Sequence, residues 1–243
     1  MVSGPETLYL DCGNTRIKYN HGRDFGTFAD LLAVSDFATN GDVSDVVIAS
    51  VSDHTAGVVS ALTAQGIEVT LASVSDGFAG LFLVYPDVSL LGVDRWLAML
   101  GARQRYPDED VWVVDAGTAL KIDFVTKEGR HQGGSISVGL ALAAKSLTGN
   151  TALLPQANLV FQGQLGQDTS GCLNFGIVYG AIALIDQSVQ TFGPDTAQVV
   201  LTGGDAEILE PYLSMPVALE PNLVLQGLKY YWRLLNEPNG ESK

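Results

Sequence analysis

LYLDCGNTRIK at Leu8–Lys18 and VVDAGTALKID at Val113–Asp123 are two similar stretches that decide the fold of this chain. Each begins as an apolar strand, delivers an aspartate (Asp11 or Asp115), turns through a glycine and a hydroxyl residue, and continues into a second strand. One such motif arises often by chance. Two copies, one opening each half of the chain, indicate an internal duplication.

Strand-like and helix-like stretches alternate around both copies, which predicts an α/β fold. Runs typical of strands lie at 7–12, 15–20, 45–50, 67–72, 111–117, 119–125, 131–139 and 198–204. Helical patterns lie at 55–65, 93–106, 173–191, 205–213 and 223–235. No low-complexity linker separates the halves, so we expect two closely packed domains, 1–106 and 107–243.

The composition excludes several classes of protein. Of 243 residues, 47% are hydrophobic and 16% are charged, which excludes disorder for the bulk of the chain. The net charge of −14 disfavours a nucleic-acid partner because it repels phosphodiesters. With no apolar run of about 18 residues and no basic, apolar leader, we expect a cytoplasmic protein without a membrane partner. We expect Cys12 and Cys172 to be reduced and buried.

Both hairpins have the composition of phosphate-binding turns. The glycine permits a close approach to backbone N–H groups, while Asn14 and Thr15 can donate hydrogen bonds to phosphate oxygens. Asp11 is suited to hold Mg²⁺ through water, and Lys18 to offset phosphate charge. Two such hairpins facing each other would bind a nucleotide triphosphate between the halves. The alternative is two tight hairpins with Asx-type turns and no ligand.

TGGDA at 202–206 lies between a predicted strand and a predicted helix, where a nucleotide's sugar or base would meet little steric hindrance. An ordinary strand-to-helix turn explains the same residues. The chain contains neither G-x-x-x-x-G-K-[ST] nor G-x-G-x-x-G after a strand, which disfavours a Walker-type ATPase and a Rossmann dehydrogenase.

Asp94 and Arg95 occupy the first turn of the helix predicted at 93–106. Asp94 is placed to accept a proton from a hydroxyl nucleophile, and Arg95 to bind an anionic substrate group. Alternatively, the carboxylate only interacts favourably with the helix dipole and Arg95 lies at the surface.

Six stretches, in this order, resemble the motifs of the type III pantothenate kinases, bacterial enzymes of coenzyme A biosynthesis. They are LYLDCGNTRIK, YPDVSLLGVDRWLAMLGA, VVDAGTALKIDFV, HQGGSISVGLALAAKSLTGNTALLP, GQDTSGCLNFGIVYGAIALID and VVLTGGDA. The resemblance extends from about Leu8 to the last helix, and its specificity lies in the order and spacing of the motifs. It implies two duplicated ribonuclease H-like halves of the actin-like ATPase type, with a nucleotide cleft between the domains.

The resemblance also implies the site residues. The ATP phosphate loop is implied to comprise Asp11, Cys12, Gly13, Asn14, Thr15, Arg16, Ile17 and Lys18, with Thr118 as a second ATP contact. The pantothenate-binding positions are implied to be Tyr85, Gly92, Val93, Asp94, Arg95 and Thr169. Asp94 is implied to be the catalytic proton acceptor, and Asp115 the ligand of a monovalent cation, potassium or ammonium. The family is homodimeric, with pantothenate bound close to the subunit interface.

Two positions depart from the family pattern. Val138 stands where a proline is expected, and Lys121 stands where a small or hydroxyl residue is expected. Val138 changes turn rigidity only. The role of Lys121 stays open, because a cation there lies either near the phosphates or in solvent.

The resulting hypothesis is an ATP-dependent and Mg²⁺-dependent pantothenate kinase that forms 4'-phosphopantothenate. One alternative is a non-catalytic transcriptional accessory factor of the same family. Another is an ATPase or phosphatase of the same superfamily that acts on a different substrate.

Overall fold

The computed structural model describes residues 6–13, 16–41, 43–51, 55–149 and 158–237, which form two compact units. The first unit contains residues 1–79, 85–105 and 223–243, and the second contains 80–84 and 106–222. The main segment of the second unit begins at residue 106. The predicted C-terminal half, 107–243, differs in its last helix, which returns to the first unit because it packs against a helix there.

The sheet of the first unit has the strand order β3-β2-β1-β4-β5. Its strands are β1 (Glu6–Cys12), β2 (Ile17–His21), β3 (Asp24–Phe28), β4 (Val43–Ser50) and β5 (Glu68–Leu71). The first three strands pair antiparallel as a meander, whereas β1, β4 and β5 are parallel.

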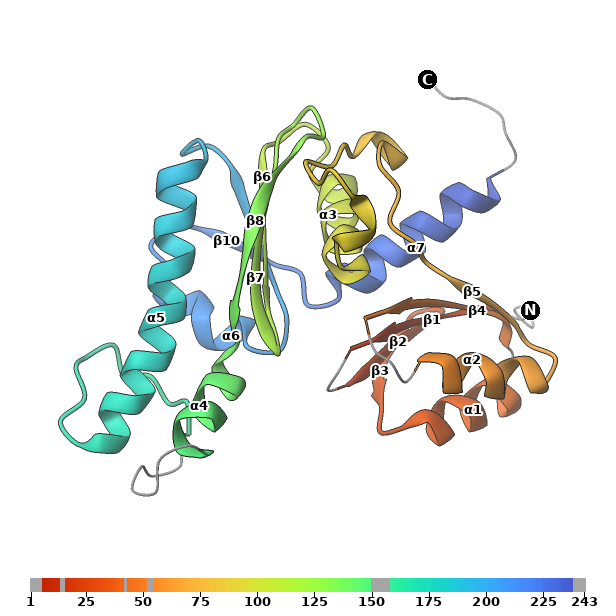
Figure 1. Ribbon diagram of the computed structural model, residues 1–243, viewed down its shortest axis with the longest axis horizontal. Coiled ribbons are helices and arrows are strands. Elements are labelled where there is room, and N and C mark those ends of the chain that lie inside the picture. Colours follow the sequence, from red (N-terminus) through yellow and green to blue (C-terminus); the bar gives the residue numbers. More distant parts are fainter. Residues whose placement is uncertain (1–5, 14–15, 42, 52–54, 150–157, 238–243) are drawn as a thin grey trace. The chain divides into compact units, whose positions relative to one another are not determined.

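The second unit contains a sheet of its own (Figure 1). Its strand order, read from the antiparallel edge as for the first sheet, is β8-β7-β6-β9-β10, which repeats the arrangement of the first unit. Its strands are β6 (Val111–Ala116), β7 (Ala119–Val125), β8 (His131–Val138), β9 (Gln198–Thr202) and β10 (Val217–Leu219). β6, β7 and β8 form the antiparallel meander, and β6, β9 and β10 are parallel. The same order and directions in both sheets confirm the duplication predicted from the two hairpin motifs.

The first sheet is covered on both faces. Helices α1 (Leu31–Asn40) and α2 (Thr55–Ala64) bury the face of β1 that carries Leu8, Leu10 and Cys12. Helix α7 (Leu223–Asn236) packs against β1, β2 and β4. The ammonium of Lys229 in α7 lies 5.7 Å from the centre of the Tyr9 ring, on the opposite face of β1.

Helix α3 (Val93–Arg105) and α7 meet at two glycines that let their backbones approach closely. A Cβ on Gly227 would lie 1.9 Å from the carbonyl oxygen of Leu97, and a Cβ on Gly101 would lie 2.7 Å from that of Leu223. Only hydrogen fits at these two positions. This contact fixes α3, whose first turn carries the candidate catalytic residues.

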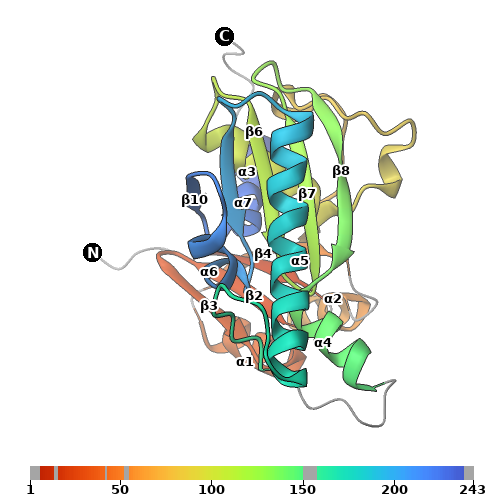
Figure 2. The ribbon, with the colours of Figure 1, turned by 90° about the vertical axis from the view of Figure 1, so that its left-hand side faces the viewer.

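In the second unit, the sheet packs against α4 (Leu140–Gly149) and α5 (Thr169–Phe192), and α6 (Ala206–Leu209) follows β9 (Figure 2). By length and composition, α5 is the one helix of the described residues that could cross a membrane. Its side chains at Ile177, Ile182 and Ile185 are nevertheless buried in the core cluster with β6 and β7. Only 33% of the most apolar 18-residue window of α5 is buried, so part of the helix lies at the surface of the unit.

Most predicted elements are present within a few residues of their expected ends. The prediction for 205–213 divides into α6 and a 3₁₀ turn, and the described 3₁₀ turns are Phe78–Gly80, Val88–Leu90 and Glu210–Tyr212. Apart from the 3₁₀ turns, four elements lie outside the ranges predicted above: β3, α1, α4 and the three-residue β10. For α1 a signal existed, because the Asp30 carboxylate caps it by accepting a hydrogen bond from the Ala33 N–H at 2.9 Å.

Gly227→Ala is expected to destabilise the protein, because its new methyl group has no room against the backbone of α3. Overpacking of this kind costs about 1–3 kcal/mol, and each kcal/mol lowers the melting temperature of a chain of this size by about 2–4 °C. Thermal melting followed by circular dichroism measures the loss.

Gly57→Ala in α2 is the control, because the nearest atom to its added Cβ is an ordinary contact at 3.5 Å. That variant is expected to melt at the parent temperature or slightly above it. Equal melting of the two variants would contradict the close α3–α7 contact.

Candidate active site

The β1–β2 hairpin places Asp11 directly opposite Lys18 in the strand register. Directly opposed residues of an antiparallel pair share one face of the sheet, so the two side chains leave their strands on the same face. At the turn, the Gly13 N–H donates to the carbonyl of Arg16 at 3.1 Å. Asn14 and Thr15, predicted to contact phosphate, lie outside the described residues.

Cys12 points to the other face of β1, into the core with α1 and α2. Burial, with a smaller contribution from the negative charge of Asp11, raises the pKa of its thiol to about 12. Cys12 therefore stays a neutral thiol and contributes to a phosphate site only through its backbone. The expectation that both cysteines are free and buried is correct for Cys12, but Cys172 is exposed on the first turns of α5.

Three of the residues predicted to bind pantothenate, Val93, Asp94 and Arg95, lie in the first turn of α3. The Arg95 side chain is buried, with the residue only 6% exposed. Its guanidinium donates to the hydroxyl of Tyr85 at 2.9 Å, and its central carbon lies 5.8 Å from the centre of that ring. The alternative in which Arg95 lies at the surface is wrong, because the side chain is buried and hydrogen-bonded to Tyr85.

The Asp94 carboxylate folds back on its own helix and accepts a hydrogen bond from the Arg95 N–H at 2.8 Å. A Cβ on Gly92 would lie 2.6 Å from the same oxygen, Oδ1, so a larger residue there would displace the carboxylate. The same hypothetical Cβ would lie 3.9 Å from Val51, whose N–H lies 3.5 Å from the Cys12 carbonyl. Val51, which is hydrogen-bonded to the end of β1, therefore also lies near Gly92, the residue before α3.

The β6–β7 hairpin of the second unit has the same construction. Its register places Asp115 opposite Lys121, and the lysine Nζ lies 2.8 Å from the aspartate Oδ2. The Gly117 N–H donates to the carbonyl of Ala119 at 3.1 Å and closes the turn, and Thr118 is exposed at its tip. Asp115, Lys121 and Thr118 therefore lie at one end of this sheet.

The TGGDA stretch lies beside this hairpin. The Asp205 N–H donates to the carbonyl of Ala116 at 2.9 Å. Gly203 has a φ of +99°, and a Cβ there would lie 2.2 Å from that carbonyl oxygen and 2.7 Å from Asp115 Oδ1. Residue 203 must therefore be glycine, because its φ is positive and its neighbours leave no room for a side chain. Two glycine turns, at 117 and 203, lie next to the Asp115 carboxylate.

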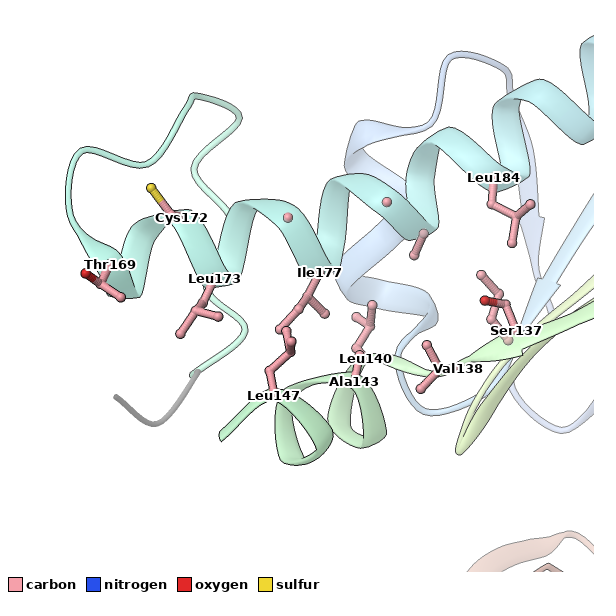
Figure 3. A pocket seen from close by; sticks show the side chains of 14 residues that line it. Ser137, Val138, Leu140, Ala143, Leu147, Thr169, Cys172, Leu173, Ile177 and Leu184 are labelled. Atoms are coloured by element: carbon pink, nitrogen blue, oxygen red, sulfur yellow. The ribbon is translucent and has the colours of Figure 1, made fainter. Parts of the chain in front are cut away.

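Thr169 lies apart from these turns, at the start of α5, where the Asp168 carboxylate caps the helix by accepting from the Gly171 N–H at 2.7 Å. It lines an apolar cavity of about 570 Å³ between α4, α5 and the end of β8 (Figure 3). Leu140 and Leu147 of α4 point toward α5 in this view, and Val138 closes the cavity at β8. The structure brings Thr169 together with apolar side chains of α4 and α5.

The ion pair between Lys121 and Asp115 is the feature of the site that sequence reasoning missed. The signal was available, because the two hairpin motifs each place a lysine across the strands from their aspartate once the strand register is counted from the turn. The predicted residues thus form two groups: Asp11–Lys18 with Tyr85, Gly92, Val93, Asp94 and Arg95 in the first unit, and Asp115, Thr118 and Thr169 in the second.

Comparison with known proteins decides between families that share this geometry. The family profile described as type III pantothenate kinase matches residues 7–191. The chain belongs to the type III pantothenate kinase family. The type III pantothenate kinase of Teredinibacter turnerae is 33% identical over 247 residues, covering 91% of this chain and 96% of that protein. The enzyme of Nitrosococcus oceani is 34% identical over 248 residues, covering 91% of each chain.

Solved structures show that the fold is that of actin-like ATPases and sugar kinases. A Campylobacter jejuni protein described as a transcriptional activator of the Baf family superimposes with a TM-score of 0.67 at 24% identity, covering 94% of this chain and 98% of that one. The activator of 2-hydroxyisocaproyl-CoA dehydratase from Clostridium difficile, solved with bound ADPNP, gives 0.53 at 12% identity, covering 98% and 100%. At these identities the likeness establishes the fold alone.

The two thiols are expected to differ in reactivity. Cys12 is buried with its pKa raised to about 12, so at pH 8 it presents almost no thiolate, whereas Cys172 is exposed. Titration of the native protein with a chromogenic disulfide at pH 8 should give one fast thiol, and the denatured protein should give both. Fast reaction of Cys12 in a Cys172→Ser variant would contradict the buried position of the β1 end.

Proposed function

We propose that this kinase transfers the γ-phosphoryl group of ATP to the primary hydroxyl of pantothenate and forms 4'-phosphopantothenate. The observation that carries the proposal is the first turn of α3, where a half-buried carboxylate, Asp94, adjoins a buried guanidinium held by Tyr85. This turn lies beside the end of β1, where the Asp11–Lys18 hairpin begins. The proposal therefore assigns a proton acceptor, an anion-binding group and a phosphate-binding turn to one unit.

In this mechanism Asp94 accepts the proton of the pantothenate hydroxyl as the oxygen attacks the γ-phosphorus. An alcohol is a poor nucleophile until that proton leaves, so a positioned base lowers the barrier. Arg95 binds the pantothenate carboxylate, because a guanidinium matches the planar geometry of that group. The hydrogen bond from Arg95 to Tyr85 fixes the direction of the guanidinium before the substrate arrives.

The glycine turn of the hairpin in each unit supplies contacts to ATP. Phosphoryl transfer depends on positioning and charge neutralisation more than on covalent chemistry, so backbone N–H groups of both glycine turns and the Lys18 ammonium supply the stabilisation. Asp11 is the residue that would hold Mg²⁺, which neutralises charge on the phosphates. Mg²⁺ in phosphoryl-transfer sites is commonly held by one or two carboxylates together with water and substrate phosphate oxygens.

The family resemblance adds a monovalent cation, potassium or ammonium, at Asp115. The carboxylate there fits such an ion poorly, because Oδ2 already accepts a hydrogen bond from the Lys121 ammonium at 2.8 Å and Oδ1 faces Gly203. No step of the proposed reaction is therefore assigned to a dissolved monovalent cation.

The reaction is placed in the cytoplasm and involves no nucleic acid or membrane, consistent with a net charge of −14.

The test is mass-spectrometric detection of phosphopantothenate from purified protein, ATP and pantothenate. ATP hydrolysis without a phosphorylated pantothenate would favour an ATPase or phosphatase of the same fold. Absence of both activities would favour an accessory factor.

Asp94→Asn is expected to lower kcat by about 10²–10⁴-fold and leave ATP affinity nearly unchanged, because the amide keeps the size of the side chain but cannot accept a proton. Steady-state kinetics and calorimetric ATP binding measure the two effects. Asp36→Asn, at an exposed position of α1 in the same unit, is the control and should keep the parent rate. A variant that melts lower but turns over pantothenate normally would reduce Asp94 to a helix-terminal carboxylate.

The assembly is proposed to be a homodimer formed through α4, α5 and β8. Each of these elements carries an exposed large apolar side chain: Ile136 of β8 is 62% exposed, Leu142 of α4 45% and Tyr179 of α5 51%. Sedimentation at micromolar concentration should give about twice the chain mass of 25.7 kDa. Leu142→Glu should shift the equilibrium toward monomer, whereas Leu32→Glu, at a 74% exposed position of α1, should not. A monomeric parent protein with full activity would contradict this assembly.

A further inference from the structure

The Asp115 carboxylate is enclosed by its own chain on two sides. Its Oδ2 lies 2.8 Å from the Lys121 Nζ, and the two side chains are only 18% and 19% exposed. Its Oδ1 lies on the side of Gly203, as the 2.7 Å separation from a Cβ built there shows. The cation nearest to this carboxylate is therefore a covalent part of the chain.

The position of Lys121 is the counterpart of Lys18 in the duplicated hairpin. Both lysines stand on the second strand of their hairpin, each directly opposite the aspartate that ends the first strand. In both hairpins one further residue pair separates this lysine and aspartate from the turn. Each half of the molecule thus presents one tethered positive charge at its phosphate-binding turn.

We propose that the Lys121 ammonium supplies the positive charge that a dissolved monovalent cation would otherwise supply at Asp115, so that nucleotide binding in this enzyme is independent of potassium. This inference rests on the proposed function, because it assigns the β6–β7 turn to ATP. The ammonium offsets the charge of Asp115, which would otherwise repel the phosphates. Opposite charges attract, so the same ammonium also favours phosphate groups at this turn.

A second cation at the same carboxylate would be repelled by Lys121 across a few ångströms, where solvent screens the repulsion only in part. The alternative role for the pair is structural, since opposite charges across two strands stabilise a hairpin. The two roles differ in what they change: the structural pair affects melting alone, whereas the charge-supplying lysine affects ATP affinity and its dependence on the cation.

The first experiment measures ATP affinity of the unmodified enzyme by titration calorimetry in potassium, ammonium, sodium and choline chloride at one ionic strength, which keeps general screening constant. The dissociation constants for ATP are expected to agree within about twofold among the four salts. A cation can change ATP affinity only if it binds the free and the ATP-bound enzyme differently. Thermal melting without nucleotide in the same salts should give one temperature. Affinity that rises about fivefold or more in potassium alone would overturn the inference.

The second experiment removes the charge. Lys121→Met keeps the length of the side chain, and its ATP affinity in choline chloride should fall by about 10–100-fold and recover selectively in potassium or ammonium. Lys121→Arg keeps a positive charge and should stay insensitive to the cation. Lys127→Met, which removes an exposed lysine from the β7–β8 turn of the same unit, is the matched control and should bind ATP like the parent.

Lys121→Met that melts lower but binds ATP like the parent in every salt would overturn the inference and leave the pair a structural one. Failure of the parent to bind ATP in any salt would overturn it as well. If the parent binds ATP independently of the cation but forms no phosphopantothenate, the inference stands and the proposed function fails, so the two failures are distinguishable.

Discussion

The alternation of side chains along the central strands β1 and β6 is the constraint on which both units depend. In β1, every second residue from Leu8 to Cys12 enters the core, so Asp11 must face the other side. In β6, Val114 and Ala116 enter the core, and Asp115 is turned away in the same manner. Because an aspartate follows the apolar run in each strand, it is delivered to the end of the sheet, beside a glycine turn.

The hairpin register then determines what meets each aspartate. A shift of one residue in β2 or β7 would move the lysine to the buried face, where an unpaired ammonium costs several kcal/mol. Burial of the core residues therefore fixes the strand register, which places Asp11 opposite Lys18 and Asp115 opposite Lys121. Stability of the sheet and placement of the charges have one cause.

Helix α3 carries a buried cation, Arg95, in its first turn. Arg95 is almost completely enclosed, and burial of a charge is tolerated only where polar groups surround it. The Tyr85 hydroxyl provides one of these groups, and the α3–α7 glycine contact keeps the helix in the place where that bond forms. The C-terminal helix α7 thus helps to fix the position of the first turn of α3 by packing against that helix.

Charge explains why such local arrangements are needed. The chain carries 13 basic and 27 acidic residues, so its overall field repels both ATP and pantothenate. A protein of this kind binds anions only where cations and backbone N–H groups are concentrated. Lys18, Arg95 and Lys121 are three of its few basic residues, and each stands at a turn or helix start of the candidate site.

The sequence by itself determined the duplicated α/β fold, the two hairpins, and the helix that begins at Asp94, because these follow from local periodicity and turn residues. It did not determine β3 or β10, which are short and acquire their structure from pairing with a neighbouring strand. Only the tertiary structure decided the placement of the last helix on the first unit and the burial of Arg95, since both result from contacts between residues distant in the sequence. It also decided the role open to Lys121, because a side chain's partner across two strands depends on register, which the turn and the buried face set together.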